Sequence, residues 1–348
     1  MKILIRATNW VGDAIMALPA LRAVRRRFHD AQITILARPY VADIYRDQQL
    51  CDQLFAYDPQ GLHAGFSGRE RLVAQLREQK FDIALLLQNA FEAAWLAWRA
   101  SIPERIGYAR DGRGFLLTRA VPVPRPGEIP PHEKFYYLEL LRRAGWLASV
   151  QDESFIDLNV PEEKRRSAAE FLSKCGARQG VLRIAIGAGA SYGSAKCWPP
   201  LRFAEMANRL QSQIDANVIL FGTAAEASVS HAISAEMHRP PIDLTGKTAI
   251  ADLPALFSQC HLFIGNDSGA MHVAAAVGLP IVAVFGPTDP DGTAPVTPRC
   301  SIVRQKPYCS PCFLRRCPTD HRCMTEITAE MVEAAARPWL SAIKVQRA

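Results

Sequence analysis

A short segment in the second half of the chain, residues 266–269, reads Asn-Asp-Ser-Gly and follows an apolar run at 261–264. Such a run is typical of a buried strand, and the segment combines capping side chains with a permissive backbone. The residues at 271–277 are mostly small and apolar, as in a helix packed under a sheet. Because the free N–H groups and the positive dipole end of a helix N-terminus favour anions, the segment predicts a phosphate-binding site.

A second loop with ligand-binding character extends from Gly187 to Pro200, between a predicted strand and a predicted helix. Gly187 and Gly189 permit close approach of a ligand to the backbone, and Lys196 supplies a point charge suited to phosphate. The alternative is an exposed lysine in an ordinary loop. Three residues separate Gly189 from Gly193, which departs from the dinucleotide fingerprint and disfavours a dehydrogenase.

Two carboxylates occupy comparable positions after predicted strands. Asp13 follows the first strand and loop, where it is either a general base at the carboxyl end of the strand or the N-cap of the next helix. Glu226 lies four residues after Gly222, at the start of another helix. A carboxylate there could accept hydrogen bonds from sugar hydroxyls, and the alternative is a favourable charge in the first helical turn.

Four of the nine cysteines cluster near the C-terminus with the spacing C-x2-C-x4-C-x5-C. They are Cys309, Cys312, Cys317 and Cys323, and His321 lies among them. In a chain expected to be cytosolic, this density favours metal binding over disulfides. The second pair lacks the spacing of a zinc ribbon, so a structural zinc, a four-cysteine iron–sulfur site and a reduced, metal-free loop are all open.

The elements that would position these residues alternate between strands and helices. In the first half the pattern predicts strands at 2–6, 33–37 and 81–87, with helices from Asp13 and over 69–79. The second half repeats the same order, beginning with a strand at 182–186. Such alternation implies parallel strands with helices on both faces. We therefore expect an α/β fold with two doubly wound domains and a cleft between them.

The domain boundary is expected near residues 152–161, because a new helix and then a new strand follow that stretch. This gives a first domain over 1–160 and a second over 161–330. A C-terminal helix over 331–348 could pack back on the first domain.

Composition narrows the class of protein. With 348 residues, of which 49% are apolar and 22% charged, the chain has the length of two globular domains and too much apolar content for disorder. No apolar run is long enough to span a bilayer, and the first residues do not have the pattern of a signal peptide. We therefore expect a cytoplasmic protein.

Charge is unevenly distributed between the two halves. Residues 1–150 carry 21 Lys and Arg against 15 Asp and Glu, whereas the remaining residues carry 20 against 19. The basic first half favours an anionic partner, either nucleic acid, a phosphorylated glycolipid or an acidic membrane face. Arg105 and Arg110 are candidate contacts, and a solvated basic surface is the alternative.

The chain resembles the ADP-heptose:lipopolysaccharide heptosyltransferases, above all the heptosyltransferase II type, in motifs that run almost from end to end. These motifs are WVGDAIMALPALRAV, QNAFEAAWLAWRASIPERIGY, GAGASYGSAKCWP, FGTAAE, GNDSGAMHVAAA and FGPTDP. The resemblance implies a GT-B fold, with two Rossmann-like domains facing each other across a cleft. It also implies an inverting transfer of heptose from ADP-heptose to the inner core of lipopolysaccharide.

The resemblance further implies a role for each candidate residue. Asp13 is the catalytic base, Lys196 holds the donor diphosphate, and Glu226 holds donor hydroxyls. The donor pocket also includes Gly187, Gly189, Asp267, Ser268, Gly269 and His272. On the acceptor side the candidates are Asn89, Arg105 and Arg110.

The implied partners are ADP-heptose and a phosphorylated lipid A–core acceptor at the inner membrane surface, with no nucleic acid. The protein would be cytoplasmic and peripheral to that membrane. Fixed positive groups could replace a metal, so no cofactor is expected for catalysis. Two other readings stay open: heptosyltransferase I or another nucleotide-sugar transferase, and a nucleotide-sugar-binding protein without turnover.

Overall fold

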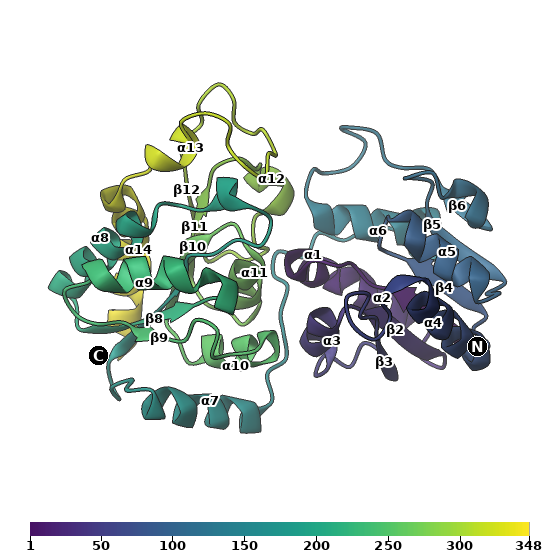
Figure 1. The fold of residues 1–348 in the computed structure, drawn as a ribbon, viewed down its shortest axis with the longest axis horizontal. Helices are drawn as coiled ribbons and strands as arrows, with labels where there is room; N and C mark the ends of the chain where they lie inside the picture. The colour runs from purple at the N-terminus through teal and green to yellow at the C-terminus, as the bar shows by residue number, and fades with distance from the viewer. Residues whose placement is uncertain (348) are drawn as a thin grey trace. The chain divides into compact units, whose positions relative to one another are not determined.

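The computed structural model describes residues 1–347, with side chains described as far as Ala342. The chain forms two compact units, the first over Met1–Glu153 and the second from Ser154 onwards (Figure 1). Each unit is built on one six-stranded sheet in which all neighbouring strands are parallel, as predicted. Among the described residues, no helix has the length and apolar character needed to cross a bilayer.

The division between the units, after Glu153, lies near the start of the boundary region predicted at residues 152–161. Ile156 and Leu158 already belong to the second unit, where both side chains are buried. Their backbone N–H groups donate to the carbonyls of Val296 and Ala276, at 3.1 and 2.7 Å. The extended segment after Glu153 is therefore part of the second unit rather than a linker.

The sheet of the first unit has the strand order β3-β2-β1-β4-β5-β6. Its strands are β1 (Lys2–Arg6), β2 (Gln32–Ala37), β3 (Gln53–Ala56), β4 (Ile83–Leu86), β5 (Glu104–Tyr108) and β6 (Arg119–Val121). Its helices are α1 (Val11–Met16), α2 (Leu18–Arg27), α3 (Pro39–Tyr45), α4 (Gly65–Gln79), α5 (Phe91–Arg99) and α6 (Glu133–Arg143). Ile3, Leu4 and Ile5 of the central strand β1 are at most 1% exposed, as expected for a strand covered on both faces.

The helix predicted from Asp13 is divided into α1 and α2. Trp10 is the N-cap of α1, and Ala17 separates the two helices. Pro19 lies in the first turn of α2, where its missing N–H group leaves no helical hydrogen bond unmade. Asp13 is consequently a residue of the first turn of α1 and not the N-cap, so its capping alternative is wrong.

The sheet of the second unit has the order β12-β11-β10-β7-β8-β9. Its strands are β7 (Leu182–Gly187), β8 (Ala216–Phe221), β9 (Ile242–Asp243), β10 (Leu262–Asn266), β11 (Ile281–Phe285) and β12 (Cys300–Arg304). The helices are α7 (Glu162–Lys174), α8 (Pro200–Gln213), α9 (Ala227–Glu236), α10 (Leu253–Ser258), α11 (Gly269–Ala276), α12 (Pro290–Thr293), α13 (Arg322–Thr325) and α14 (Ala329–Arg347). Since β7, β10 and β11 are parallel neighbours, the loops that follow them lie at one edge of the sheet.

The C-terminal helix α14 packs on the core of the second unit, and its packing on the first domain stays a prediction. It contacts α8, β10, β11 and β12. Val332, Ala336 and Leu340, spaced as one helical face, are buried in the same core as Trp198. The Trp198 indole donates to the carbonyl of Ile327, just before the helix, at 2.9 Å.

Candidate functional site

A buried ion pair joins the two phosphate-binding segments predicted from the sequence. Lys196 ends the short 3-10 helix Ser194–Lys196, and its Nζ lies 2.5 Å from Oδ2 of Asp267. The two side chains are only 12% and 4% exposed. Thr288, which follows β11, donates its hydroxyl to the same carboxylate oxygen at 2.7 Å. These three residues, the lysine cluster, therefore lie at the carboxyl edge formed by β7, β10 and β11.

The side-chain amide of Asn266 connects the loops at this sheet edge by hydrogen bonds. It is fully buried, and its Oδ1 accepts a hydrogen bond from the backbone N–H of Trp198 at 3.0 Å. Its Nδ2 donates to the carbonyl of Ala188 at 2.6 Å. The amide thus ties the end of β10 to both sides of the loop that carries Lys196, a role that sequence reasoning missed.

The predicted helix N-terminus is present beside the lysine cluster. Ser268 is the N-cap of α11, and its Oγ accepts a hydrogen bond from the N–H of Met271 at 3.4 Å. Gly269 is the first residue of the helix, and His272 lies in its first turn, 4% exposed. The positive end of the α11 dipole therefore lies directly after Asp267 in the chain.

Glu226 is fixed by a capping box in front of α9. Its Oε2 accepts hydrogen bonds from the backbone N–H and the hydroxyl of Thr223, at 2.7 and 3.0 Å. Gly189 lies against the same carboxylate, because a Cβ at this position would be 1.7 Å from Oε1 of Glu226. Gly187 instead allows packing inside the sheet, because a Cβ there would meet the ring of Phe263 at 2.7 Å.

In the first unit, three predicted residues line one pocket with a volume of about 260 Å³. They are Asp13, Asn89 and Arg110, which follow the carboxyl ends of β1, β4 and β5. The other lining residues are Asp111, Glu133, Tyr136 and Tyr137. Carboxylates, an amide, phenols and a cation at one sheet edge can bind a polar, anionic ligand and exchange a proton with it.

Arg113 fixes the polar wall of this pocket. Its guanidinium is fully buried and donates to Oδ1 of Asn89 at 3.1 Å and to the carbonyl of Gln88. Burial lowers the pKa of Arg113 to about 10, so the group still carries its charge at neutral pH. Asn89 then donates its Nδ2 to the Tyr136 hydroxyl at 3.0 Å. The orientation of the Asn89 amide is therefore set on both sides.

Arg110 supplies the exposed charge of the pocket. A hydrogen bond with Tyr136 raises the pKa of Arg110, and its side chain remains 54% exposed. Burial raises the pKa of Glu133, while the nearby Arg110 opposes that rise. Asp111 is the ion-pair partner of Arg110, with 3.5 Å between Arg110 Nε and Asp111 Oδ1. Sequence reasoning missed Glu133 and Tyr136, because they come from α6 and carry no motif.

The chain is similar to known sugar transferases along most of its length. The model of glycosyltransferase family 9 (heptosyltransferase) matches residues 69–322. Lipopolysaccharide heptosyltransferase 2 of Salmonella typhimurium strain LT2 is 30% identical over 313 residues, which cover 87% of this chain and 88% of the relative. The chain belongs to glycosyltransferase family 9.

Solved structures agree with this family 9 assignment. The structure of E. coli ADP-heptose lps heptosyltransferase II matches with a TM-score of 0.82 at 26% identity, covering 99% of this chain and 100% of that one. A family 9 glycosyl transferase from Veillonella parvula DSM 2008 matches with a TM-score of 0.83 at 24% identity, over 98% and 97% of the two chains. The predicted family, GT-B fold type and glycosyltransferase class are confirmed.

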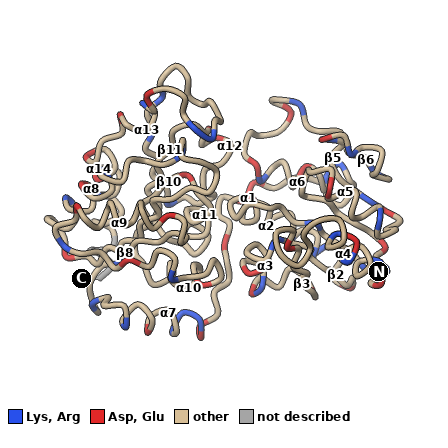
Figure 2. Tube along the Cα trace, in the orientation of Figure 1, with Lys and Arg blue, Asp and Glu red and all other residues tan. Residues whose placement is uncertain are grey.

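Arg105, predicted alongside Arg110, lies outside the pocket of this glycosyltransferase. Its guanidinium donates to the carbonyls of Ile102 and Leu116, at 2.5 and 2.7 Å, and so braces β5 against the following turn. Basic and acidic residues are interspersed over the first unit (Figure 2), and many of its arginines form ion pairs. Ion pairs therefore neutralise part of the excess of positive charge.

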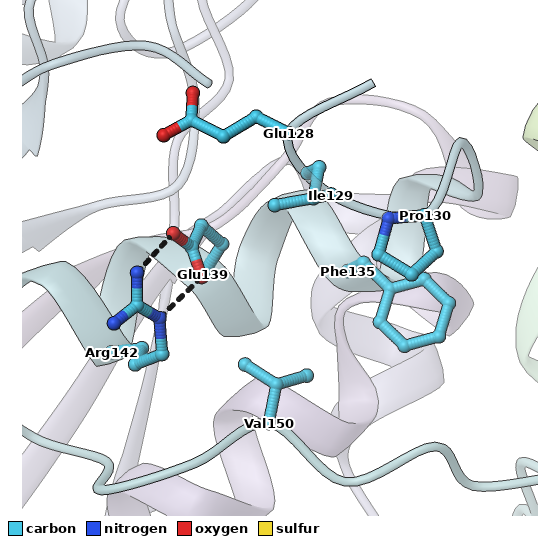
Figure 3. Close-up of a pocket in the computed structure, with 7 residues that line it drawn as sticks. All are labelled: Glu128, Ile129, Pro130, Phe135, Glu139, Arg142 and Val150. Carbon is cyan, nitrogen blue, oxygen red and sulfur yellow. Dashed lines mark hydrogen bonds and ion pairs between the residues drawn. The ribbon is translucent and has the colours of Figure 1, made fainter. Parts of the chain in front are cut away.

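A second pocket of the first unit, about 240 Å³ in volume, has no predicted site residue in its lining (Figure 3). It is bordered by Glu128, Ile129, Pro130, Phe135, Glu139, Arg142 and Val150. Glu139 accepts two hydrogen bonds from Arg142, both at 2.7 Å, and one from Arg143 at 2.6 Å, so its charge is already compensated. We assign it no part in the reaction.

The four clustered cysteines lie in the segment between β12 and α14, and the three states that their spacing left open stay predictions. Among the residues that the structure describes, no three His, Cys, Asp or Glu side chains gather as metal ligands. Cys323 is buried whereas Cys309 is exposed. Burial, and then the neighbouring Cys312, raises the pKa of the Cys323 thiol to about 11. Backbone hydrogen bonds fix the position of this cysteine-containing segment. For example, the Cys312 N–H donates to the carbonyl of Pro287 at 3.0 Å.

Proposed function

We propose that this glycosyltransferase moves a heptose from ADP-heptose to the phosphorylated inner core of lipopolysaccharide, inverting the anomeric carbon. The observation that carries the proposal is the lysine cluster, which places a nearly buried cation beside a helix N-terminus at the carboxyl edge of a doubly wound sheet. Such an edge is where α/β folds bind nucleotides. Relatives named for heptose transfer to lipopolysaccharide support the choice of sugar and acceptor.

On the donor side, Lys196 and the first turn of α11 would stabilise the negative charge that grows on departing ADP. Fixed positive groups are effective here because they need no reorganisation during the reaction. Asp267 keeps the lysine in place through their 2.5 Å ion pair. Glu226, whose carboxylate lies against the Gly189 loop, would accept hydrogen bonds from donor hydroxyls. His272 would complete the wall of the nucleotide pocket.

On the acceptor side, Asp13 would be the general base. Asn89, held by Arg113 and Tyr136, would orient the acceptor hydroxyl, and Arg110 would contact an acceptor phosphate. In the single displacement the acceptor oxygen bonds to the anomeric carbon as its proton passes to Asp13. The bond from that carbon to the diphosphate oxygen breaks, and its electron pair leaves with ADP.

Exposed aromatic rings beside the pocket support a carbohydrate acceptor. Trp10, Phe91 and Phe115 follow the carboxyl ends of β1, β4 and β5, and each is at least 43% exposed. The ring centroids of Phe91 and Phe115 lie 6.2 Å apart. Flat rings of this kind provide apolar contact area next to polar groups, which suits sugar rings that have one apolar face.

The experiment that tests the proposal combines purified protein with a panel of nucleotide sugars and inner-core acceptors, with and without a first heptose, and measures released nucleotide diphosphate. We expect ADP release with ADP-heptose and the acceptor that already carries one heptose. Release of ADP with the acceptor that lacks heptose would favour the heptosyltransferase I type. Release of nucleotide diphosphate from a different nucleotide sugar would contradict the assignment of ADP-heptose as the donor. Binding of ADP-heptose without release would favour a binding protein.

A further inference from the structure

The segment 309–323, here called the cysteine loop, packs against the segment 187–200 that carries Lys196, here called the lysine loop. The backbone N–H of Ala195 donates to the carbonyl of Arg315 at 3.1 Å. The hydroxyl of Tyr192 donates to the carbonyl of Phe313 at 2.7 Å. His321 Nε2 lies 2.7 Å from the carbonyl oxygen of Ala195. Three contacts therefore join the cysteine loop to the four residues before Lys196.

The contact between the two loops is close enough to exclude a side chain. A Cβ at Gly193 would lie 2.2 Å from the carbonyl oxygen of Arg315, a distance that real Cβ atoms do not show. Glycine therefore lets the backbone of Arg315 approach the lysine loop directly. The position of Arg315 is thus set by backbone packing and does not depend on its own side chain.

Two cations share one aromatic ring at this contact. The Nζ of Lys196 lies 4.9 Å from the ring centroid of Tyr192, and the guanidinium carbon of Arg315 lies 5.3 Å from the same centroid. Cations are attracted to aromatic faces, so the tyrosine offsets part of the repulsion between the two charges. The ring therefore holds both charges in one small region.

The charges at this point do not balance. Lys196 is paired with Asp267, whereas no ion pair joins Arg315 to a carboxylate within the part of the chain that the structure describes. Arg315 is also exposed, so its planar donor group can reach a ligand. A diphosphate has the complementary charge, and a guanidinium can bind two phosphate oxygens at once.

We propose that Arg315 is a second binding residue for the donor diphosphate, held beside Lys196 by the ring of Tyr192. The inference rests on the proposed function, because it takes Lys196 as the first diphosphate contact. Cleavage of the sugar–oxygen bond leaves an additional electron pair on ADP, so a second cation binds the leaving group more strongly than the intact donor. The cysteine loop then contributes to the donor site through its backbone and Arg315.

The test measures binding of ADP and of adenosine to the full-length protein by calorimetry. We expect Arg315→Ala and Arg315→Gln to raise the Kd for ADP about ten-fold, as for a hydrogen bond to a charged group. Adenosine binding should be unchanged in both variants, because it lacks the diphosphate. Arg316→Ala is the matched control: it removes an adjacent exposed arginine and should leave both affinities unchanged.

A second pair of variants tests whether the Tyr192 ring holds Arg315 beside Lys196. Tyr192→Phe keeps the ring and loses only the hydrogen bond to Phe313, whereas Tyr192→Leu loses both, so Leu should weaken ADP more than Phe does. Unchanged ADP affinity in both Arg315 variants would overturn the proposal, as would an equal loss of adenosine binding. If the wild-type protein bound no ADP, the proposed function would fail as well, and that result is distinct from a variant-specific one.

Discussion

The carboxylate of Asp267 contacts two side chains, those of Lys196 and Thr288, which follow different strands. Its Oδ2 pairs with Lys196 and accepts the hydroxyl of Thr288, and the carboxylate is almost completely buried. A buried ion pair adds little net stability, because desolvation offsets most of the attraction. Its value here is position: the carboxylate fixes the lysine ammonium at one point of the sheet edge. Sequence reasoning took Asp267 as a direct pocket residue, whereas its contacts are those of a residue that orients Lys196.

The general base can be tested by Asp13→Asn. We expect turnover to fall by ~10²–10⁴-fold, the usual contribution of a general base, because the amide cannot take the acceptor proton. Stability should change little, since Asp13 is not the N-cap of α1. The measurements are kcat, the thermal midpoint and ADP affinity. Asp30→Asn, which changes an exposed carboxylate of the same unit outside the pocket, is the control and should remain active. Turnover near that of the wild type in Asp13→Asn would rule out the base.

Elements could be predicted where a single periodic pattern decides them. The apolar runs that became β1, β2, β7 and β10 each end at a polar or glycine-rich loop, and this placed Asp13, Lys196 and Asp267 correctly at strand ends. The buried arginine Arg113 could not be found this way, because its partners are carbonyls and an amide brought together by the fold.

Helix α14 is attached to α8 by a buried carboxylate, and this sets a pH dependence. Glu333 has no exposed surface and accepts hydrogen bonds from Arg209, Gln213 and Arg337 at 2.7 to 2.8 Å. Burial alone would raise the pKa of Glu333, but these donors outweigh it and lower the pKa to about 2. The stabilisation is therefore complete above the ordinary pKa of about 4.5 and is lost as the pH falls toward about 2.

We expect Glu333→Gln to lower the free energy of unfolding by about 3 kcal/mol at pH 7. The difference from the wild type should shrink between pH 4.5 and 2, because the wild-type carboxyl becomes neutral there as well. Denaturant titrations at several pH values measure this. Glu330→Gln, which alters a half-exposed ion pair with the same Arg209, should cost far less. A penalty that stayed constant from pH 7 to pH 2 would contradict the assignment.

At the scale of the whole molecule, the proposed donor-binding and acceptor-binding residues belong to different units. The lysine cluster, Glu226 and the α11 terminus belong to the second unit, and the pocket of Asp13, Asn89 and Arg110 belongs to the first. Strand–helix alternation predicted two doubly wound domains. The sequence placed the boundary within residues 152–161 but not its exact position at Glu153, because an extended segment without periodicity gives no sign of which core it will join.

Steady-state kinetics with donor and acceptor varied separately test this division most directly. Lys196→Ala should raise the KM for ADP-heptose or lower kcat, with little change in the KM for the acceptor. Arg110→Ala should raise the KM for the acceptor several-fold, and more strongly at low salt, where an exposed charge is least screened. Arg125→Ala, an exposed arginine of the same unit outside the pocket, is the control. An Arg110 variant with impaired ADP binding and an unchanged acceptor KM would contradict the division.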